Sequence, residues 1–202
     1  MPNNPSAADA LTFNVAGLLA EPAGSIREIE VEAPPLDLHV EVDASVEGDA
    51  DDLIVMEEPP ELTSDIRGKL KLTRTNRGLL VQARLHTSMA ESCSRCLRDI
   101  DWPIDIEIDE EALPSIDLVS GQPVNTAAEP DELRLTDHHE LELEGEVRDA
   151  ALLAEPIAPL CREDCPGLCA ICGQELGSGP HDHPDEDVDP RLAALREFQQ
   201  PD

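Results

Sequence analysis

The spacing of six cysteines constrains this chain more than any other feature. Four of them lie in LCREDCPGLCAICG, residues 160–173, and two lie far upstream in CSRCL, as Cys93 and Cys96. A CxxC turn presents two thiolates about 3.5–4 Å apart, which suits one edge of a tetrahedral zinc ion. The pairs Cys93/Cys96 and Cys169/Cys172 therefore predict one closed, structural four-thiolate zinc site that joins the end of the chain to its middle.

Other ligand sets fit the same sequence. Cys161 and Cys165 could complete a site with Cys169 and Cys172 alone, and six cysteines with two histidines could fill two four-coordinate sites. The Pro- and Asp-rich surroundings of His181 and His183 favour solvated loop residues over ligands. A CxxC pair can also be a redox dithiol, but the βαβ pattern that would place it at a helix N-terminus is missing. Buried, inert cysteines are the remaining alternative.

Composition explains why a metal would be useful. The chain has 202 residues, a net charge of −31, two Phe, one Trp and no Tyr, so its core must be built from aliphatic side chains. A structural zinc adds about 10 kcal/mol of apparent binding free energy to folding. Residues 1–25 carry no Lys or Arg before a short apolar patch, and no run of about 18 apolar residues occurs, so we expect neither a signal peptide nor a membrane span. We expect a cytoplasmic protein, in which reduced thiols favour metal over disulfides.

The charge is unevenly distributed. Residues 66–98 hold eight basic residues and one acid, whereas residues 1–65 hold sixteen acids and one base. A body this acidic is repelled by RNA phosphate, so any direct contact with RNA must use the basic segment. Alternatively, these basic residues have no binding role and form only the solvent-exposed face of a strand. The candidate nucleic-acid-binding residues are Arg67, Lys69, Lys71, Arg74, Arg77, Arg84, Arg95 and Arg98.

Alternating apolar and polar residues predict a β-rich first half. Strands are expected within residues 26–45, where Leu36, Leu38, Val40 and Val42 share one face, and in short runs at residues 11–15 and 53–56. Residues 66–88 predict a β-hairpin with its turn at residues 76–78, and a further strand covers residues 102–108.

The second half predicts helices around the cysteines. Residues 115–132 lack periodicity and are expected to be a loop, LELEGEVRDALLAEP predicts a helix ending before Pro156, and Asp189-Pro190 starts a short closing helix ending at Phe198. The expected fold is α+β, with a β-rich antiparallel sheet or open barrel, a C-terminal helix and a zinc-knuckle segment. Its predicted parts are a flexible N-terminus (1–25), a β-rich body with the basic hairpin and first CxxC (26–114), a linker (115–132) and the helix, knuckle and closing helix (133–198).

Catalytic motifs do not emerge. With 45 Asp and Glu residues, pairs of carboxylates carry no information. The sequence has no phosphate-binding glycine loop, nucleophile turn or metalloprotease His-Glu motif, so we expect neither an enzyme nor a small-molecule substrate.

The order of motifs resembles the YceD family, the large ribosomal RNA subunit accumulation proteins. CSRCL after a basic hairpin, a VRD helix leading into PLCREDCPGLCAICG and a final DPRLAAL carry the resemblance, roughly over residues 66–198. Many relatives have an Asn-rich turn and further cysteines where this chain has GSGPHDH. The resemblance implies a non-enzymatic role in ribosome biogenesis.

Two hypotheses follow for the partner. In one, the basic hairpin and first CxxC contact the backbone of large-subunit ribosomal RNA; scarce aromatics argue against base stacking. In the other, the protein is an acidic escort for a basic ribosomal protein, and the hairpin charges only balance neighbouring acids.

Overall fold

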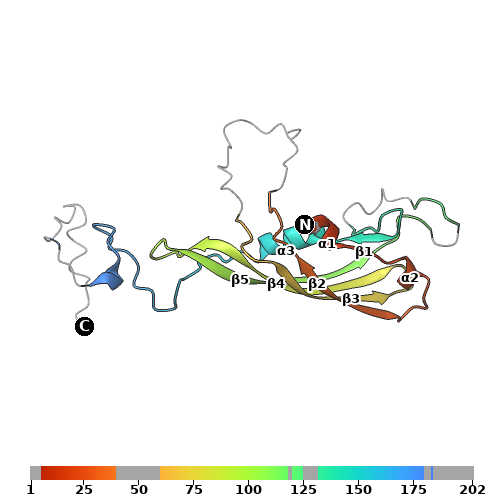
Figure 1. The fold of residues 1–202 in the computed structure, drawn as a ribbon, viewed down its shortest axis with the longest axis horizontal. Coiled ribbons are helices and arrows are strands. Elements are labelled where there is room, and N and C mark those ends of the chain that lie inside the picture. The colour runs from red at the N-terminus through yellow and green to blue at the C-terminus, as the bar shows by residue number, and fades with distance from the viewer. Residues whose placement is uncertain (1–5, 40–59, 118–119, 125–131, 180–182, 184–202) are drawn as a thin grey trace, which may run out of the picture.

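An antiparallel four-stranded sheet forms the body of the protein. The computed structural model describes residues 6–39, 60–117, 120–124, 132–179 and 183 (Figure 1). Its sheet has the order β2-β3-β4-β5, and a two-stranded sheet pairs β1 with β6. Both sheets are open, so the predicted α+β fold with an antiparallel sheet is confirmed. The strands are β1 (Thr12–Asn14), β2 (Ile26–Ala33), β3 (Ile66–Arg74), β4 (Leu79–Ser92), β5 (Asp99–Ala112) and β6 (Glu140–Glu142).

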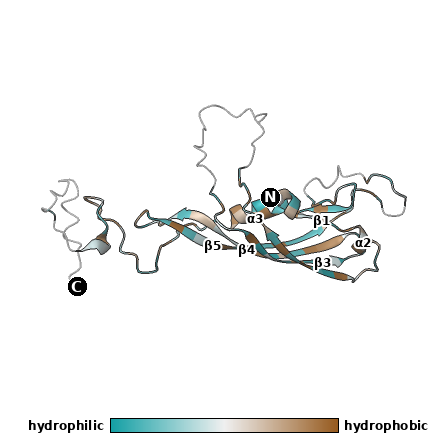
Figure 2. Cartoon of the chain, in the orientation of Figure 1, coloured by the Kyte–Doolittle hydropathy of each residue, from teal (hydrophilic) through white to brown (hydrophobic). Residues whose placement is uncertain are grey.

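The predicted β-hairpin is β3 and β4. Thr75 closes its turn by donating its N–H to the Gly78 carbonyl at 3.0 Å, while its Oγ1 accepts from the N–H groups of Arg77 and Gly78. Burial alternates along both strands, and the change between apolar and polar residues is visible in Figure 2. One face of the sheet is therefore core and the other is solvent-exposed.

Helices cover the apolar face. The predicted helix before Pro156 is α3 (Glu144–Leu153), which packs against β5 and buries Val147 and Ala151. Two short helices, α1 (Ala7–Ala10) and α2 (Ala16–Leu19), lie near the N-terminus. Leu11, Val15 and Leu18 are at most 1% exposed and belong to the main core.

The N-terminal part corrects one expectation. The segment 1–25 was predicted to be flexible, yet residues 6–25 form α1, β1 and α2, and β1 pairs with β6. The physical reason is that a core with few aromatics needs more aliphatic side chains, and this segment supplies them. Residues 1–5 lie outside the described part of the chain.

The strand predicted after Pro35 is also wrong over residues 36–39, the part of it that the structure describes. Residues 36–39 have no strand partner, although Leu36 and Leu38 are buried in the core. The pair Pro34-Pro35 removes two backbone donors at the point where the ladder would continue. Residues 40–45, the predicted strand at 53–56 and the closing helix at 189–198 lie outside the described residues.

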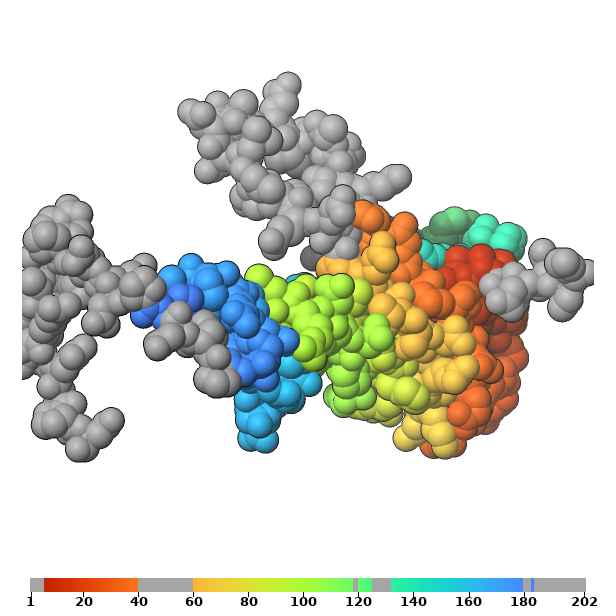
Figure 3. Space-filling view, turned by 60° about the vertical axis from the view of Figure 1, so that its left-hand side comes forward, coloured from red at the N-terminus to blue at the C-terminus, as the bar shows by residue number. Residues whose placement is uncertain are grey.

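Strands β4 and β5 form a long hairpin whose tip carries the first cysteine pair. Each strand has 14 residues, and they pair continuously from Leu79 and Ala112 to Ser92 and Asp99. The tip reaches away from α3, and the chain after α3 runs along it to the same end (Figure 1). In the space-filling view, the blue C-terminal segment packs on this light-green tip (Figure 3).

Candidate metal centre

The first CxxC turn is formed by the tip of the β4–β5 hairpin. The Leu97 N–H donates to the Cys93 carbonyl at 2.8 Å, and the Cys93 N–H donates to the Arg98 carbonyl at 2.9 Å. These two bonds bend the chain tightly, so that Leu97 takes a left-handed φ of 57°. Cys93 and Cys96 are thereby both directed to one side and are buried, with 0% and 9% exposure.

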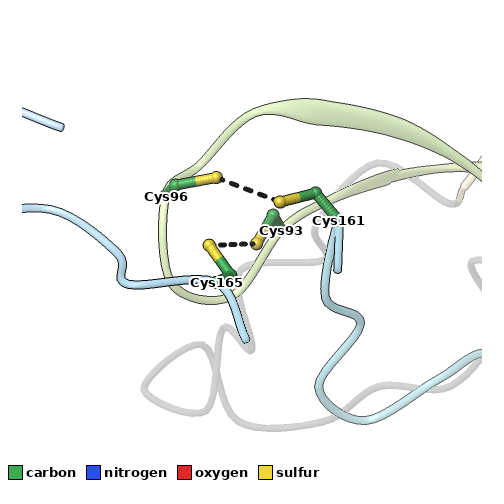
Figure 4. A group of neighbouring side chains, drawn as sticks. All are labelled: Cys93, Cys96, Cys161 and Cys165. Carbon is green, nitrogen blue, oxygen red and sulfur yellow. Dashed lines mark hydrogen bonds between the residues drawn. The ribbon is translucent and has the colours of Figure 1, made fainter. Parts of the chain in front are cut away.

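The segment after α3 is bound to this turn by backbone contacts. The Ser94 N–H donates to the Pro159 carbonyl at 2.9 Å, and the Leu168 N–H donates to the Arg95 carbonyl at 3.1 Å. Arg95 in turn donates from Nη1 to the Cys165 carbonyl at 2.9 Å. Residues 159–168 therefore wrap the tip of the hairpin and bring Cys161 and Cys165 to the first pair (Figure 4).

Four sulfur atoms converge at this point. Cys93 Sγ lies 3.8 Å from Cys165 Sγ, and Cys96 Sγ lies 3.7 Å from Cys161 Sγ, with all four within 4.8 Å of one another (Figure 4). A regular tetrahedron with Zn–S bonds of about 2.3 Å has S–S edges of about 3.8 Å. The four thiols thus fit the ligand set of a closed, structural zinc site.

The electrostatics of the cluster favour a bound cation. Backbone N–H groups, first that of Cys161 and then those of Cys96 and Arg95, lower the pKa of Cys93 to about 6 against the effect of burial. Burial, followed by the neighbouring thiols, raises the pKa of Cys161 to about 12. The Cys93 thiolate is thus stabilised, while burial and the neighbouring thiols oppose ionisation of Cys161. A divalent cation removes that conflict.

This geometry corrects the predicted ligand pairing. Cys93 and Cys96 were expected to join Cys169 and Cys172, but the structure places them with Cys161 and Cys165. The Ser94–Pro159 hydrogen bond fixes where the returning chain meets the tip, so the next two cysteines reach the first pair. The second CxxC turn lies beyond them in its own small hairpin, closed by the bridge between Leu168 and Glu175.

A second donor cluster surrounds that second turn. Cys169, Cys172 and His183 have ligand atoms within 4.8 Å of one another, and Cys169 Sγ lies 3.2 Å from His183 Nε2. His183 was predicted to be a solvated loop residue; it is instead half-buried beside a thiol. Cys169 lies 14 residues earlier in the chain, and the composition around His183 gave no sign that the two side chains are neighbours. His181 lies outside the described residues.

Comparison with known protein families finds a match for the part of the chain that contains the cysteine motifs. Residues 81–199 match the family described as large ribosomal RNA subunit accumulation protein YceD. The matched residues make up more than half of the chain. The chain belongs to the YceD family.

Proteins similar to this chain occur in mycobacteria. Uncharacterized proteins of Mycobacterium tuberculosis and Mycobacterium bovis are each 32% identical over 133 residues, which is 66% of this chain and 61% of the relative. One of Mycobacterium leprae is 30% identical over 152 residues, 75% of this chain and 65% of the relative. The matches thus span less than two thirds of these relatives. No solved structure matches.

The family's ribosomal description directs attention to the eight candidate basic residues, of which Arg67, Lys69, Lys71 and Arg84 lie on the exposed face of the sheet. Cross-strand register arranges them in rows: Glu32, Arg67, His86 and Asp105 form one, Glu30, Lys69, Arg84 and Glu107 the next, and Glu28, Lys71, Gln82 and Asp109 the third. In each row the central strands β3 and β4 hold the basic or amide side chains, and the outer strands hold acids. These three rows hold six carboxylates and four cations.

Several of these cations contact those acids directly. Lys69 Nζ lies 3.4 Å from Glu30 Oε1, and Arg84 Nη2 lies 2.7 Å from Asp109 Oδ2. Hydrogen bonds from Gln82 and Arg84 lower the pKa of Asp109. Arg67 pairs with Glu32 at 3.1 Å. The three rows together are therefore net negative and not a positive patch.

The other four candidate residues make contacts at the turns. Arg74 donates to the carbonyls of Leu19, Thr75 and Gly78, and Arg77 lies 3.8 Å from carboxylate oxygens of Glu111 and Glu132. Arg95 binds the Cys165 carbonyl, and Arg98 forms an ion pair with Glu175. In this structure these side chains stabilise turns and the knuckle.

No helix in the described ranges is long and apolar enough to cross a membrane.

Proposed function

We propose that this protein is a non-enzymatic, cytoplasmic ribosome-biogenesis factor that supports accumulation of large-subunit ribosomal RNA, with a structural zinc held by Cys93, Cys96, Cys161 and Cys165. Membership of the YceD family supports the biological role. The convergence of four thiols at tetrahedral spacing is the observation that supports the zinc.

A structural role for the metal follows from the closed ligand set. Four thiolates leave no coordination position for water or substrate, which is what a catalytic zinc requires. Among the described residues, Leu160 and Leu168 are the apolar side chains that pack on the four cysteines, and the cluster is separate from the main core. The metal would replace the apolar core that this end of the molecule lacks and would fix residues 159–168 to the hairpin tip.

A dithiol redox function is less well supported. Backbone N–H groups stabilise the Cys93 thiolate, but Cys93 and Cys96 are buried at a hairpin tip, with 0% and 9% exposure, and are therefore not accessible to a disulfide substrate. Thiol reactivity depends on both conditions.

The charge arrangement favours a basic protein as the direct partner. In the three rows of the exposed sheet face, carboxylates outnumber cations six to four, and both outer strands are acidic. An RNA backbone would have to displace these carboxylates from Arg67, Lys69 and Arg84, whereas a basic ribosomal protein would meet the acidic outer strands without breaking the rows. We therefore propose that the protein escorts a basic ribosomal protein.

Direct contact with ribosomal RNA is the second candidate, and the family description favours it. It would use the basic segment, Arg67, Lys69, Lys71, Arg74, Arg77, Arg84, Arg95 and Arg98. If the partner is a basic ribosomal protein, binding should survive removal of RNA and should depend on the acidic side chains. If the partner is ribosomal RNA, binding should be lost with the RNA and should depend on the basic side chains.

The test is a pull-down of ribosomal components with and without RNase, using two matched variants. One carries Arg67→Ser, Lys69→Ser and Arg84→Ser, and the other carries Glu28→Gln, Glu30→Gln and Glu107→Gln. We expect a ribosomal protein to remain bound after complete RNA digestion and to be lost in the Gln variant only. Binding that disappears with RNase and in the Ser variant would overturn the escort route in favour of RNA contact.

The biological role has its own test. Depletion of the protein should lower large-subunit ribosomal RNA relative to small-subunit ribosomal RNA, and the wild-type chain should restore the ratio. An unchanged ratio would contradict a role in large-subunit accumulation.

A further inference from the structure

The second CxxC turn has the same backbone structure as the first. The Gly173 N–H donates to the Cys169 carbonyl at 2.8 Å, and the Cys169 N–H donates to the Gln174 carbonyl at 2.8 Å. In the first turn, the matching bonds join Leu97 to Cys93 and Cys93 to Arg98. Gly173 has a left-handed φ of 71°, where Leu97 has 57°. A turn that orients two thiols for a metal is thus present twice.

His183 adds a third possible metal ligand to the two cysteines of the second turn. His183 Nε2 lies 3.2 Å from Cys169 Sγ, and Cys172 Sγ lies within 4.8 Å of both. In a regular tetrahedral zinc site, a nitrogen and a sulfur ligand are about 3.5 Å apart, given Zn–N of about 2.0–2.1 Å and Zn–S of about 2.3 Å. The observed separation is a few tenths of an ångström below that edge, so binding requires only a small shift of the imidazole.

The second cluster has ligands of its own. It shares no residue with Cys93, Cys96, Cys161 and Cys165. The two turns nevertheless contact each other, because the Leu168 N–H binds the Arg95 carbonyl and Arg98 pairs with Glu175. The first site therefore holds the second turn in position without competing for its ligands.

We propose that Cys169, Cys172 and His183 bind a second divalent transition-metal ion, with zinc as the physiological candidate. Two thiolates and one imidazole are borderline-soft donors, which suit zinc and cobalt better than magnesium or calcium. Three protein ligands leave one tetrahedral position for water or another donor. Cys172 is exposed and Cys169 is half-buried, so this ion is open to solvent and exchanges faster than the ion in the buried site.

The test is a titration of the reduced, metal-free full-length protein with Co²⁺, followed by its visible and near-ultraviolet absorption. We expect two equivalents to bind. The sites differ in ligands, so the two cobalt spectra differ as well: the all-sulfur site absorbs at longer wavelength than the site with nitrogen and an open position. Zinc should displace both ions.

Two variants assign the second equivalent. Cys172→Ser and His183→Ala should each reduce the stoichiometry from two to one and should leave the all-sulfur spectrum unchanged. His138→Ala, at a side chain with 79% exposure, is the matched control and should still bind two equivalents. Circular dichroism of each variant verifies that the sheet is folded.

The proposal fails if the wild-type protein binds a single equivalent. It also fails if either Cys172→Ser or His183→Ala still binds two. These outcomes concern the second ion alone, so they leave the first site and the ribosomal role unaffected.

Discussion

The two CxxC turns have the same hydrogen-bonding pattern but different partners. Cys93 and Cys96 meet two thiols from a segment 65 and 72 residues further along the chain, in a buried cluster. Cys169 and Cys172 meet one imidazole in a more exposed cluster. The difference teaches that a CxxC turn supplies half of a site, while long-range packing decides the other half and the accessibility of the ion.

The largest effect is expected when the zinc proposed for the buried four-thiol site is removed. The four cysteines at the hairpin tip would then have no metal to hold them together. Local folding would lose the roughly 10 kcal/mol that the bound ion contributes. Under strong chelation we expect residues 159–179 to lose protection from hydrogen exchange, while β2 to β5 keep theirs because their core is separate. Hydrogen exchange measured by mass spectrometry tests this. Equal loss over the sheet and the knuckle would show that they are one cooperative unit.

Gly173→Ala should destabilise the second turn. No atom lies within 4 Å of a Cβ placed there, so the cost is the left-handed φ alone, about 1 kcal/mol. We expect weaker Co²⁺ binding at the second site, by about fivefold for that free energy, with the all-sulfur spectrum unchanged. Equal weakening of both sites would mean that the two turns do not act separately.

Leu97→Gly is the reciprocal change in the first turn. Leu97 is 67% exposed, so little packing is lost when the left-handed strain is relieved. The gain is partly offset by the flexibility of glycine in the unfolded chain, which leaves a net stabilisation of about 0.5 kcal/mol. Denaturant unfolding of the zinc-loaded protein measures it. A clear loss of stability would show that the Leu97 side chain is needed in the turn.

The smallest effect is expected for the ion pair that joins the turns. Arg98 and Glu175 have side chains that are 58% and 42% exposed, so the coupling should be no more than about 0.5 kcal/mol and should fall with added salt. A double-mutant cycle with Arg98→Ala and Glu175→Ala measures it. A coupling above about 1 kcal/mol that is insensitive to salt would indicate that the pair positions the two turns.

The sequence was most informative where structure is local. Alternation predicted β2, β3, β4 and β5, the residues at 76–78 predicted the hairpin turn, and helical spacing before Pro156 predicted α3. Each of these depends on neighbours within a few residues, and each was confirmed. An antiparallel sheet or open barrel followed from them, and the structure has open antiparallel sheets.

The ligand pairing could not be predicted because it depends on contacts between distant segments. Two matched CxxC turns suggested a single site, but the Ser94–Pro159 hydrogen bond brings Cys161 and Cys165 to the first pair instead. The same limit applies to His183, whose polar neighbours concealed a position beside Cys169. The mixed charge rows also required strand register, since Glu30 and Glu107 are far from Lys69 and Arg84 in the sequence.

The most direct test of the central claim compares tightly bound zinc in two pairs of variants. Cys161→Ser and Cys165→Ser are expected to lose the chelator-resistant zinc, whereas Cys169→Ser and Cys172→Ser should retain it. Elemental analysis after exhaustive dialysis against a chelator under reducing conditions gives the result. Retention in the first pair and loss in the second would contradict the four-thiol site at the hairpin tip and would restore the pairing of Cys93 and Cys96 with Cys169 and Cys172.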